Sequence, residues 1–211
     1  MEEQKQEQVA LEAKKGTKIN KIVANGFKSF AKHTEFILSN GFNVILGPNG
    51  SGKSNVLDAL CFVLGKSSSK SLRAEKSSNL IYNGGKNKSP TKQGEVSIFF
   101  DNSNKTFPSE DQEIKITRIV RQSGQSVYRI NDKTRTRQQI LDLLAMGKIN
   151  PDGYNIILQG DIVKLVEMHP VERRELIEEV AGISVYEEKK HKALLELAKV
   201  EEKFKETEIV L

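Results

Sequence analysis

A glycine-rich octapeptide carries the clearest chemistry in this sequence: Gly47, Pro48, Asn49, Gly50, Ser51, Gly52, Lys53 and Ser54. It matches the phosphate-binding loop pattern G-x-x-x-x-G-K-[ST] at every fixed position. Glycines in such a loop let backbone N–H groups surround phosphate oxygens, and the helix that follows adds the positive end of its dipole. We expect Lys53 to reach the β- and γ-phosphates and the Ser54 hydroxyl to bind Mg²⁺. The octapeptide therefore predicts a binding site for a nucleoside triphosphate and Mg²⁺.

The segments on either side of the octapeptide fit this prediction. Residues 42–46 form a short apolar run of strand length, and residues 55–64 read as a helix that is apolar nearly all round. A helix of that kind is expected to be buried. Strand, glycine-rich turn and helix is the arrangement in which the motif binds phosphate.

The second half of such a site is missing from the sequence. A P-loop ATPase needs a carboxylate at the end of another strand to hold Mg²⁺ and polarise water. The nearest apolar run, residues 156–158, ends instead in Gln159. Its carbonyl oxygen can bind Mg²⁺ and its amide can orient water, but it cannot accept a proton as a carboxylate does. No Leu-Ser-Gly-Gly-type motif opens a helix, since the similar residues 123–125 lie at a predicted hairpin turn.

Composition limits the class of protein. The 211 residues suffice for one large domain or one domain with an appendage, and the formal net charge is +5. A single cysteine, Cys61, rules out intrachain disulfides and fits a reducing compartment. The three histidines show no metal-ligand spacing, and no apolar run is long enough to cross a bilayer. We therefore expect a cytoplasmic protein without membrane contact.

Hydrophobic periodicity predicts the remaining elements. Residues 1–18 are polar and predict a disordered segment or a frayed helix. From residue 186 onward, a 3-4 spacing of apolar side chains predicts the start of a coiled coil, with an ordinary amphipathic surface helix as the alternative. Strands are expected at 19–27, 34–38, 95–100, 113–120, 126–130 and 154–158, and further helices at 137–146 and 170–180.

Taken in order, several blocks resemble the N-terminal half of the head of SMC (structural maintenance of chromosomes) proteins, closest to the archaeal and bacterial type. The resemblance runs from about residue 19 to the end, and its last two blocks are more specific than the P-loop. The blocks are 26–30, 47–55, 58–65, 72–74, 150–161 and 172–182.

The resemblance implies roles for individual residues. The P-loop, extended to Asn55, would bind ATP, and Gln159 would be the Q-loop glutamine. Arg73 falls where the family has an arginine that responds to DNA or assists hydrolysis; the alternative is an ordinary surface arginine. Lys28 and Ser29 fall beside the nucleotide's base and ribose, with a hairpin-turn lysine as the alternative for Lys28.

The resemblance also implies the architecture: an α/β P-loop NTPase domain of the ABC-ATPase type, with a mixed sheet around the P-loop helix. We expect a polar extension at 1–18, the N-terminal head lobe at 19–182 and the start of a coiled-coil arm at 183–211. A C-terminal lobe, from the same or a second chain, would bring the missing carboxylate and signature motif. Two heads would then enclose ATP between them, so ATP hydrolysis is expected only from a completed, dimerised head.

The resemblance also implies a function, and several alternative functions remain open. The chain would serve an ATPase of chromosome condensation and segregation associated with the nucleoid, whereas a RecN-like repair ATPase, a small P-loop kinase and a pure binding module remain alternatives. Clustered bases can neutralise DNA phosphates without sequence preference, but they also occur on ordinary solvated faces. Two such groups are Lys66, Lys70, Arg73 and Lys76, and Lys115, Arg118, Arg121, Arg129, Lys133, Arg135 and Arg137.

Overall fold

The computed structural model describes residues 17–66, 68–85, 89–151, 153, 156–158, 161–180, 190 and 193–200. The chain divides into two compact units, Met1–Asp152 and Gly153–Leu211. Each unit is described by itself below, and the first contains the P-loop.

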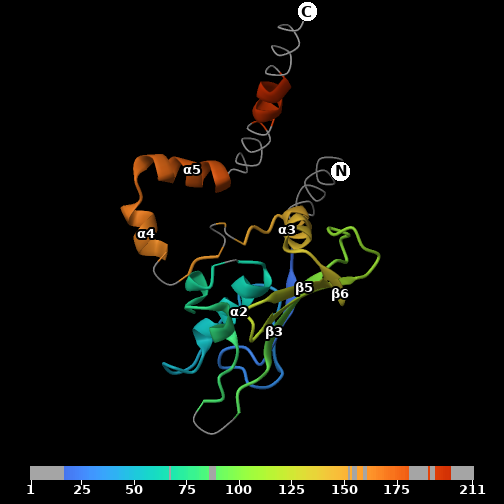
Figure 1. The fold of residues 1–211 in the computed structure, drawn as a ribbon, viewed down its shortest axis with the longest axis vertical. Helices are drawn as coiled ribbons and strands as arrows, with labels where there is room; N and C mark the ends of the chain where they lie inside the picture. Colours follow the sequence, from blue (N-terminus) through green and yellow to red (C-terminus); the bar gives the residue numbers. More distant parts are fainter. Residues whose placement is uncertain are drawn as a thin grey trace, which may run out of the picture. The chain divides into compact units, whose positions relative to one another are not determined.

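An antiparallel sheet of six strands forms the framework of the first unit (Figure 1). Its strand order is β2-β1-β3-β4-β5-β6, and every pair of neighbours is antiparallel. The strands predicted at 19–27, 34–38, 95–100, 113–120 and 126–130 are confirmed, with small shifts at their ends. The strands are β1 (Ile19–Asn25), β2 (Thr34–Ile37), β3 (Gln93–Asp101), β4 (Glu113–Arg121), β5 (Ser126–Ile130) and β6 (Lys133–Arg135).

Alternation along the strands gives the sheet its buried face. Ile22 pairs with Ile98, Ile98 with Ile116, and Ile116 with Ile130, so isoleucines form a row across four strands. Because successive side chains point to opposite faces of a strand, the residues two positions along join the same face. Both Ile98 and Ile116 are fully buried. β-branched side chains pack well on such a pleated surface, which explains why these segments form strands.

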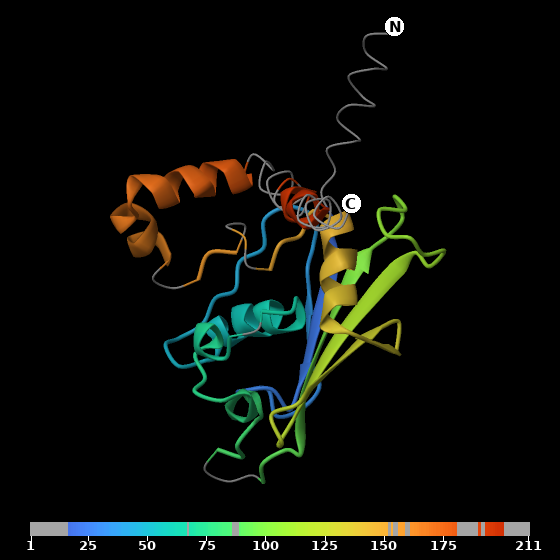
Figure 2. The ribbon, with the colours of Figure 1, turned by 45° about the horizontal axis from the view of Figure 1, so that its top comes forward.

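Helix α2 (Lys53–Val63) covers one face of this sheet, as Figure 2 shows. The rings of Phe27 and Phe62 lie 5.1 Å apart between their centroids, and both side chains are fully buried. The predicted buried helix is confirmed. Two short 3-10 helices, η1 (Lys70–Leu72) and η2 (Ser77–Leu80), follow α2 and bury one leucine each, Leu72 and Leu80.

Helix α3 (Arg137–Met146) is confirmed with the predicted bounds. It begins with a capping box, in which the Thr136 hydroxyl accepts from the Gln139 backbone and the Gln139 side chain accepts from the Thr136 backbone. Such a cap satisfies two backbone donors that would otherwise lack partners. Its buried residues are Ile140 and Leu144.

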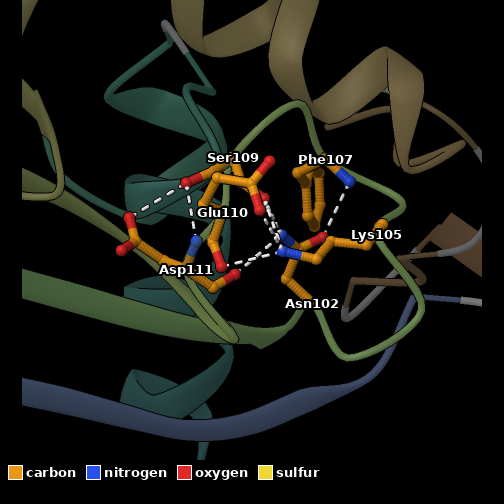
Figure 3. A network of polar contacts seen from close by, with 6 residues as sticks. All are labelled: Asn102, Lys105, Phe107, Ser109, Glu110 and Asp111. Atoms are coloured by element: carbon orange, nitrogen blue, oxygen red, sulfur yellow. Dashed lines mark hydrogen bonds and ion pairs between the residues drawn. The ribbon is translucent and has the colours of Figure 1, made fainter.

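The loop between β3 and β4 is ordered by one buried asparagine (Figure 3). The Asn102 amide donates to the carbonyls of Ser109 and Asp111, and its oxygen accepts from the Phe107 backbone N–H at 2.9 Å. Lys105 donates to the Glu110 carbonyl at 2.8 Å. This loop is therefore held by its own side chains.

Two predicted strands are wrong, and four short elements were missed. Residues 42–46 are not paired in a strand ladder, and residues 156–158 are not a strand either. All strand pairing among the described residues is antiparallel, so the parallel pairing implied by a mixed sheet does not occur there. A strand needs a hydrogen-bonded neighbour, and the described residues offer none to 42–46. The elements missed were β6, α4 and the 3-10 helices η1 and η2.

The second unit contains α4 (Asp161–Glu167) and α5 (Pro170–Val180), with α5 at its predicted bounds. Residues 193–200 are helical, and Ala193, Leu197 and Val200, which belong to the predicted apolar stripe, are exposed. The later part of that stripe, in residues 201–211, and the polar segment at residues 1–16 lie outside the described residues. Within the described part of the chain, no helix has the length and apolar character to span a membrane.

Candidate nucleotide site

The phosphate-binding loop lies at the N-terminal end of α2, and residues 47–51 are exposed. Gly52 is the residue before the helix and has φ of 94°, in the left-handed region that favours glycine. A Cβ atom placed on Gly52 would lie 2.7 Å from the Ser29 hydroxyl oxygen. A residue other than glycine at position 52 would therefore be strained on this path.

The helix end has the properties of a phosphate site. No side chain caps the N-terminus of α2, and its first turn contains no acidic residue. Backbone N–H groups at such an end have no intrahelical partner and bind anions readily. The Lys53 ammonium donates to the carbonyls of Gly47 and Pro48, both at 2.7 Å, so it lies across the loop. Lys53 and the exposed Ser54 therefore fit a triphosphate and its Mg²⁺.

Ser29 and Asn55 meet beside Gly52. The Asn55 amide donates to the Ser29 hydroxyl oxygen at 2.9 Å, which joins the segment after β1 to the first turn of α2. This contact places both residues next to the phosphate-binding loop.

A buried carboxylate that the sequence analysis missed lies one turn further along α2. The Asp58 side chain is only 4% exposed and forms ion pairs with both Lys28 and Arg73. Lys28 also donates to the Leu72 carbonyl at 2.6 Å, and Arg73 donates weakly to the Asn55 side chain at 3.4 Å. An acidic residue within an otherwise apolar helix was the signal for this cluster, because such a residue needs partners when buried.

The backbone around these cations is unusual. Lys28 and Arg73 have φ values of 46° and 54°, in a region that non-glycine residues seldom adopt. Residues held in such conformations cluster at functional sites. The structure thus joins the predicted site residues Lys28 and Arg73 through Asp58, which was not predicted, and Arg73 in turn contacts Asn55.

Gln159 lies outside the described residues, so the geometry does not test its predicted role. Among the residues that the structure describes, no three His, Cys, Asp or Glu side chains gather as a metal site. Ser54, the other predicted Mg²⁺ ligand, is exposed in the first turn of α2.

Part of the predicted basic DNA cluster has a structural role instead. The guanidinium of Arg118 is buried against the other end of α2, where it donates to the carbonyls of Phe62 and Lys66, both at 2.9 Å. It also lies over the rings of Phe62 and Tyr128, at 4.2 and 4.9 Å. Burial lowers the pKa of Arg118 and raises the pKa of Tyr128.

Two further members of the cluster also have protein partners. Arg137 donates to the Gly65 carbonyl at 2.9 Å, and Lys115 is paired with Asp132 at 2.8 Å. Assigning Arg118 to a DNA surface was therefore wrong, because its charge is enclosed by the fold. Exposed basic residues of that group are Arg121, Lys133 and Arg135.

Comparison with known proteins agrees with this geometry. Residues 18–165 match the family model described as the RecF/RecN/SMC N terminal domain. Chromosome partition protein Smc of Pyrococcus furiosus is 46% identical over 194 residues, which are 92% of this chain and 16% of that protein. The chain thus spans about a sixth of the length of this relative.

Solved SMC heads share the fold. The Smc head domain of Pyrococcus furiosus, with an extended coiled coil and bound to the C-terminal domain of ScpA, is 48% identical with a TM-score of 0.78. That match covers 88% of this chain and 47% of the solved one. A structure from work on ATP-driven dimerization and DNA-stimulated activation of SMC ATPases is 47% identical with a TM-score of 0.72. It covers 77% of this chain and 98% of the solved one.

These matches confirm the predicted fold class, a P-loop ATPase head, and favour SMC over the RecN-like alternative, since the relatives compared are chromosome partition proteins. The phosphate-binding loop, the uncapped start of α2 and the antiparallel sheet all lie within the matched residues. The chain belongs to the RecF/RecN/SMC N-terminal domain family, as the N-terminal part of an SMC head.

Proposed function

We propose that this chain binds ATP and Mg²⁺ as the N-terminal lobe of the ATPase head in a chromosome partition protein. The observation that carries the proposal is the uncapped N-terminus of α2, with Lys53 held across an exposed phosphate-binding loop. The backbone N–H groups bind phosphate oxygens, Lys53 neutralises the β- and γ-phosphates, and Ser54 holds Mg²⁺. Bound Mg²⁺ supplies charge neutralisation at the phosphates.

The exposed apolar segment before the loop supports completion of the head by a second lobe. Phe42 is 93% exposed and Leu46 is 85% exposed, although both stand in a run of strand-like composition. Exposed apolar patches of this kind mark interaction surfaces. A C-terminal lobe, from the same or a second chain, would pair with this segment and bring the Mg²⁺ carboxylate and signature motif.

Two completed heads would then enclose ATP, with Gln159 orienting water and Arg73 responding to DNA or assisting hydrolysis. The related head studied for ATP-driven dimerization and DNA-stimulated activation supports this assignment, and the relative bound to ScpA supports a similar accessory partner. The helical residues 193–200 support a coiled-coil arm. We also propose that the assembled complex contacts DNA without sequence preference and that it acts in the cytoplasm at the nucleoid.

Nucleotide binding tests the core of the proposal. Lys53→Ala removes the side-chain cation at the β- and γ-phosphates, so titration with a labelled ATP analogue in Mg²⁺ buffer should show at least about a hundredfold weaker binding, equivalent to about 2.8 kcal/mol. Lys32→Ala removes an exposed lysine away from the loop and serves as the control. Equal affinity of the Lys53→Ala variant and the wild type would remove the nucleotide site.

Turnover tests the need for a second lobe. The chain alone should bind the nucleotide but release phosphate no faster than background, because the proposal assigns the Mg²⁺ carboxylate and the signature motif to the second lobe. Adding a C-terminal lobe with its returning coiled coil should restore turnover that rises more than linearly with head concentration. In that complex, Gln159→Ala should reduce turnover more than nucleotide affinity. Robust Lys53-dependent turnover by the chain alone would contradict this proposal and favour a self-contained kinase or NTPase.

A further inference from the structure

The buried carboxylate beside the phosphate-binding loop has one more cation than it needs. Asp58 is paired with both Lys28 and Arg73, so the cluster contains two positive charges and one negative charge. The carboxylate is 4% exposed, so it cannot rely on water for its stability and needs at least one cation in contact. Either cation alone meets that need.

The two cations differ in their freedom to leave. The Lys28 side chain is 11% exposed, and its ammonium is also held by the Leu72 carbonyl at 2.6 Å. The Arg73 side chain is 43% exposed, and its other contact, with Asn55, is long at 3.4 Å. Arg73 is therefore the cation that solvent and ligands can reach, and Lys28 is the one that the protein encloses.

We propose that Asp58 and Lys28 are positioning residues: Asp58 stores Arg73 beside the phosphate-binding loop, and Lys28 stays behind as the counter-ion when Arg73 leaves to bind a phosphate group. A guanidinium matches phosphate oxygens well and exchanges one anion for the other. Without Lys28, the departure of Arg73 would leave a buried carboxylate unpaired, which is strongly unfavourable. Lys28 thus controls how readily Arg73 binds a ligand without touching that ligand.

This inference rests on the proposed function, because it concerns how Arg73 reaches phosphate in an SMC head. The phosphate can belong to a DNA backbone or to a nucleotide. Two probes distinguish these sources: a short fluorescein-labelled DNA duplex titrated over a range of salt concentrations, and a labelled ATP analogue with Mg²⁺.

The decisive comparison uses Lys28→Met alone and together with Asp58→Asn. Lys28→Met leaves Arg73 as the sole partner of Asp58, so ligand affinity should fall about tenfold, as it should in Arg73→Ala. If DNA is the source, the slope of log affinity against log salt should also decrease by about 0.9, the value for one lost phosphate contact. Adding Asp58→Asn removes the charge that retains Arg73, so affinity should return to within about twofold of wild type. Lys28→Arg keeps the counter-ion and should behave as wild type.

Lys32→Met is the matched control, because it removes one exposed lysine four positions away. Three results would overturn the proposal: unchanged affinity of Lys28→Met for both probes, a double variant as weak as Lys28→Met, or an Arg73→Ala variant that binds both probes as well as wild type. The second result would assign Lys28 to direct phosphate contact. Failure of the nucleotide site itself is recognised separately, since Lys53→Ala would then keep its affinity for the ATP analogue.

A measurement on the wild-type protein keeps the proposal testable if Lys28→Met does not fold. Nuclear magnetic resonance can follow the Arg73 guanidinium and the Lys28 ammonium while the probe is added. We expect the Arg73 signal to shift and the Lys28 signal to stay near its starting position. Parallel shifts of both signals, or no shift of Arg73, would overturn the proposal.

Discussion

The two ends of helix α2 use arginine in opposite ways. At the C-terminal end, the buried guanidinium of Arg118 lies over the rings of Phe62 and Tyr128 and donates to the carbonyls of Phe62 and Lys66. At the N-terminal end, Arg73 is 43% exposed and shares one carboxylate with Lys28. The C-terminal end is closed by the antiparallel sheet, whereas the N-terminal end is open. One helix is therefore fixed at one end and available to ligands at the other.

The largest effect should come from breaking the closed end. Arg118→Met would remove the guanidinium hydrogen bonds to the Phe62 and Lys66 carbonyls and its packing on two aromatic rings, so the free energy of unfolding should fall by about 3 kcal/mol. Thermal unfolding should show this as a decrease in Tm of about 6–12 °C. Arg121→Met, an exposed residue on the same strand, is the control and should change stability by less than about 0.5 kcal/mol. Equal stabilities of the two variants would contradict the conclusion that Arg118 stabilises the packing of α2 on β4.

Sequence alternation contained the signal for this difference. Ile114, Ile116, Arg118 and Val120 share one parity along β4, and all four are buried. Grouping Arg118 with its basic neighbours hid the fact that a strand turns alternate residues to opposite faces. The alternation of apolar and polar residues therefore predicted the strands correctly. Grouping basic residues by sequence position alone wrongly assigned Arg118 to a DNA-binding surface.

At the N-terminal end of α2, the sequence predicted local features but not contacts between distant segments. The phosphate-binding loop and α2 were predicted because their pattern is local, whereas the apolar run at 42–46 was wrongly predicted as a strand because a ladder depends on a neighbour. Asp58 was missed because its two partners are 30 and 15 residues away. Contacts between distant segments leave little trace in a single sequence.

A second, smaller effect should come from closing the open end. Gly52→Ala forces a non-glycine residue to φ near 94° and places Cβ against the Ser29 hydroxyl. The free energy of unfolding should fall by about 1–3 kcal/mol, measured by chemical denaturation. Adding Ser29→Gly relieves the contact but not the backbone strain, so it should restore only part of the loss. Full recovery in that double variant would show that the contact alone matters.

The two arginines can then be compared directly. Arg73→Ala leaves Lys28 beside Asp58, so the buried carboxylate keeps a counter-ion and stability should fall by less than about 1 kcal/mol. Thermal unfolding beside the Arg118→Met variant measures the contrast. If Arg73→Ala were as destabilising as Arg118→Met, Arg73 would be part of the core and not a residue available to ligands.

The smallest effect should come from the apolar segment that leads into the loop. Leu46 directly precedes the phosphate-binding loop in the sequence, and Leu64 is the residue at the C-terminal end of α2. Leu46 is 85% exposed, whereas Leu64 is 2% exposed. Burial, and not side-chain type, determines the hydrophobic contribution to stability. Leu46→Ser should therefore change the free energy of unfolding of this chain by less than about 0.5 kcal/mol, whereas Leu64→Ala should lower it by about 2–5 kcal/mol. A dye that fluoresces on exposed apolar surface should bind less to Leu46→Ser than to wild type. A large loss of stability in Leu46→Ser would mean that residues 42–46 pack within this chain, and would remove the support they give to docking of a second lobe.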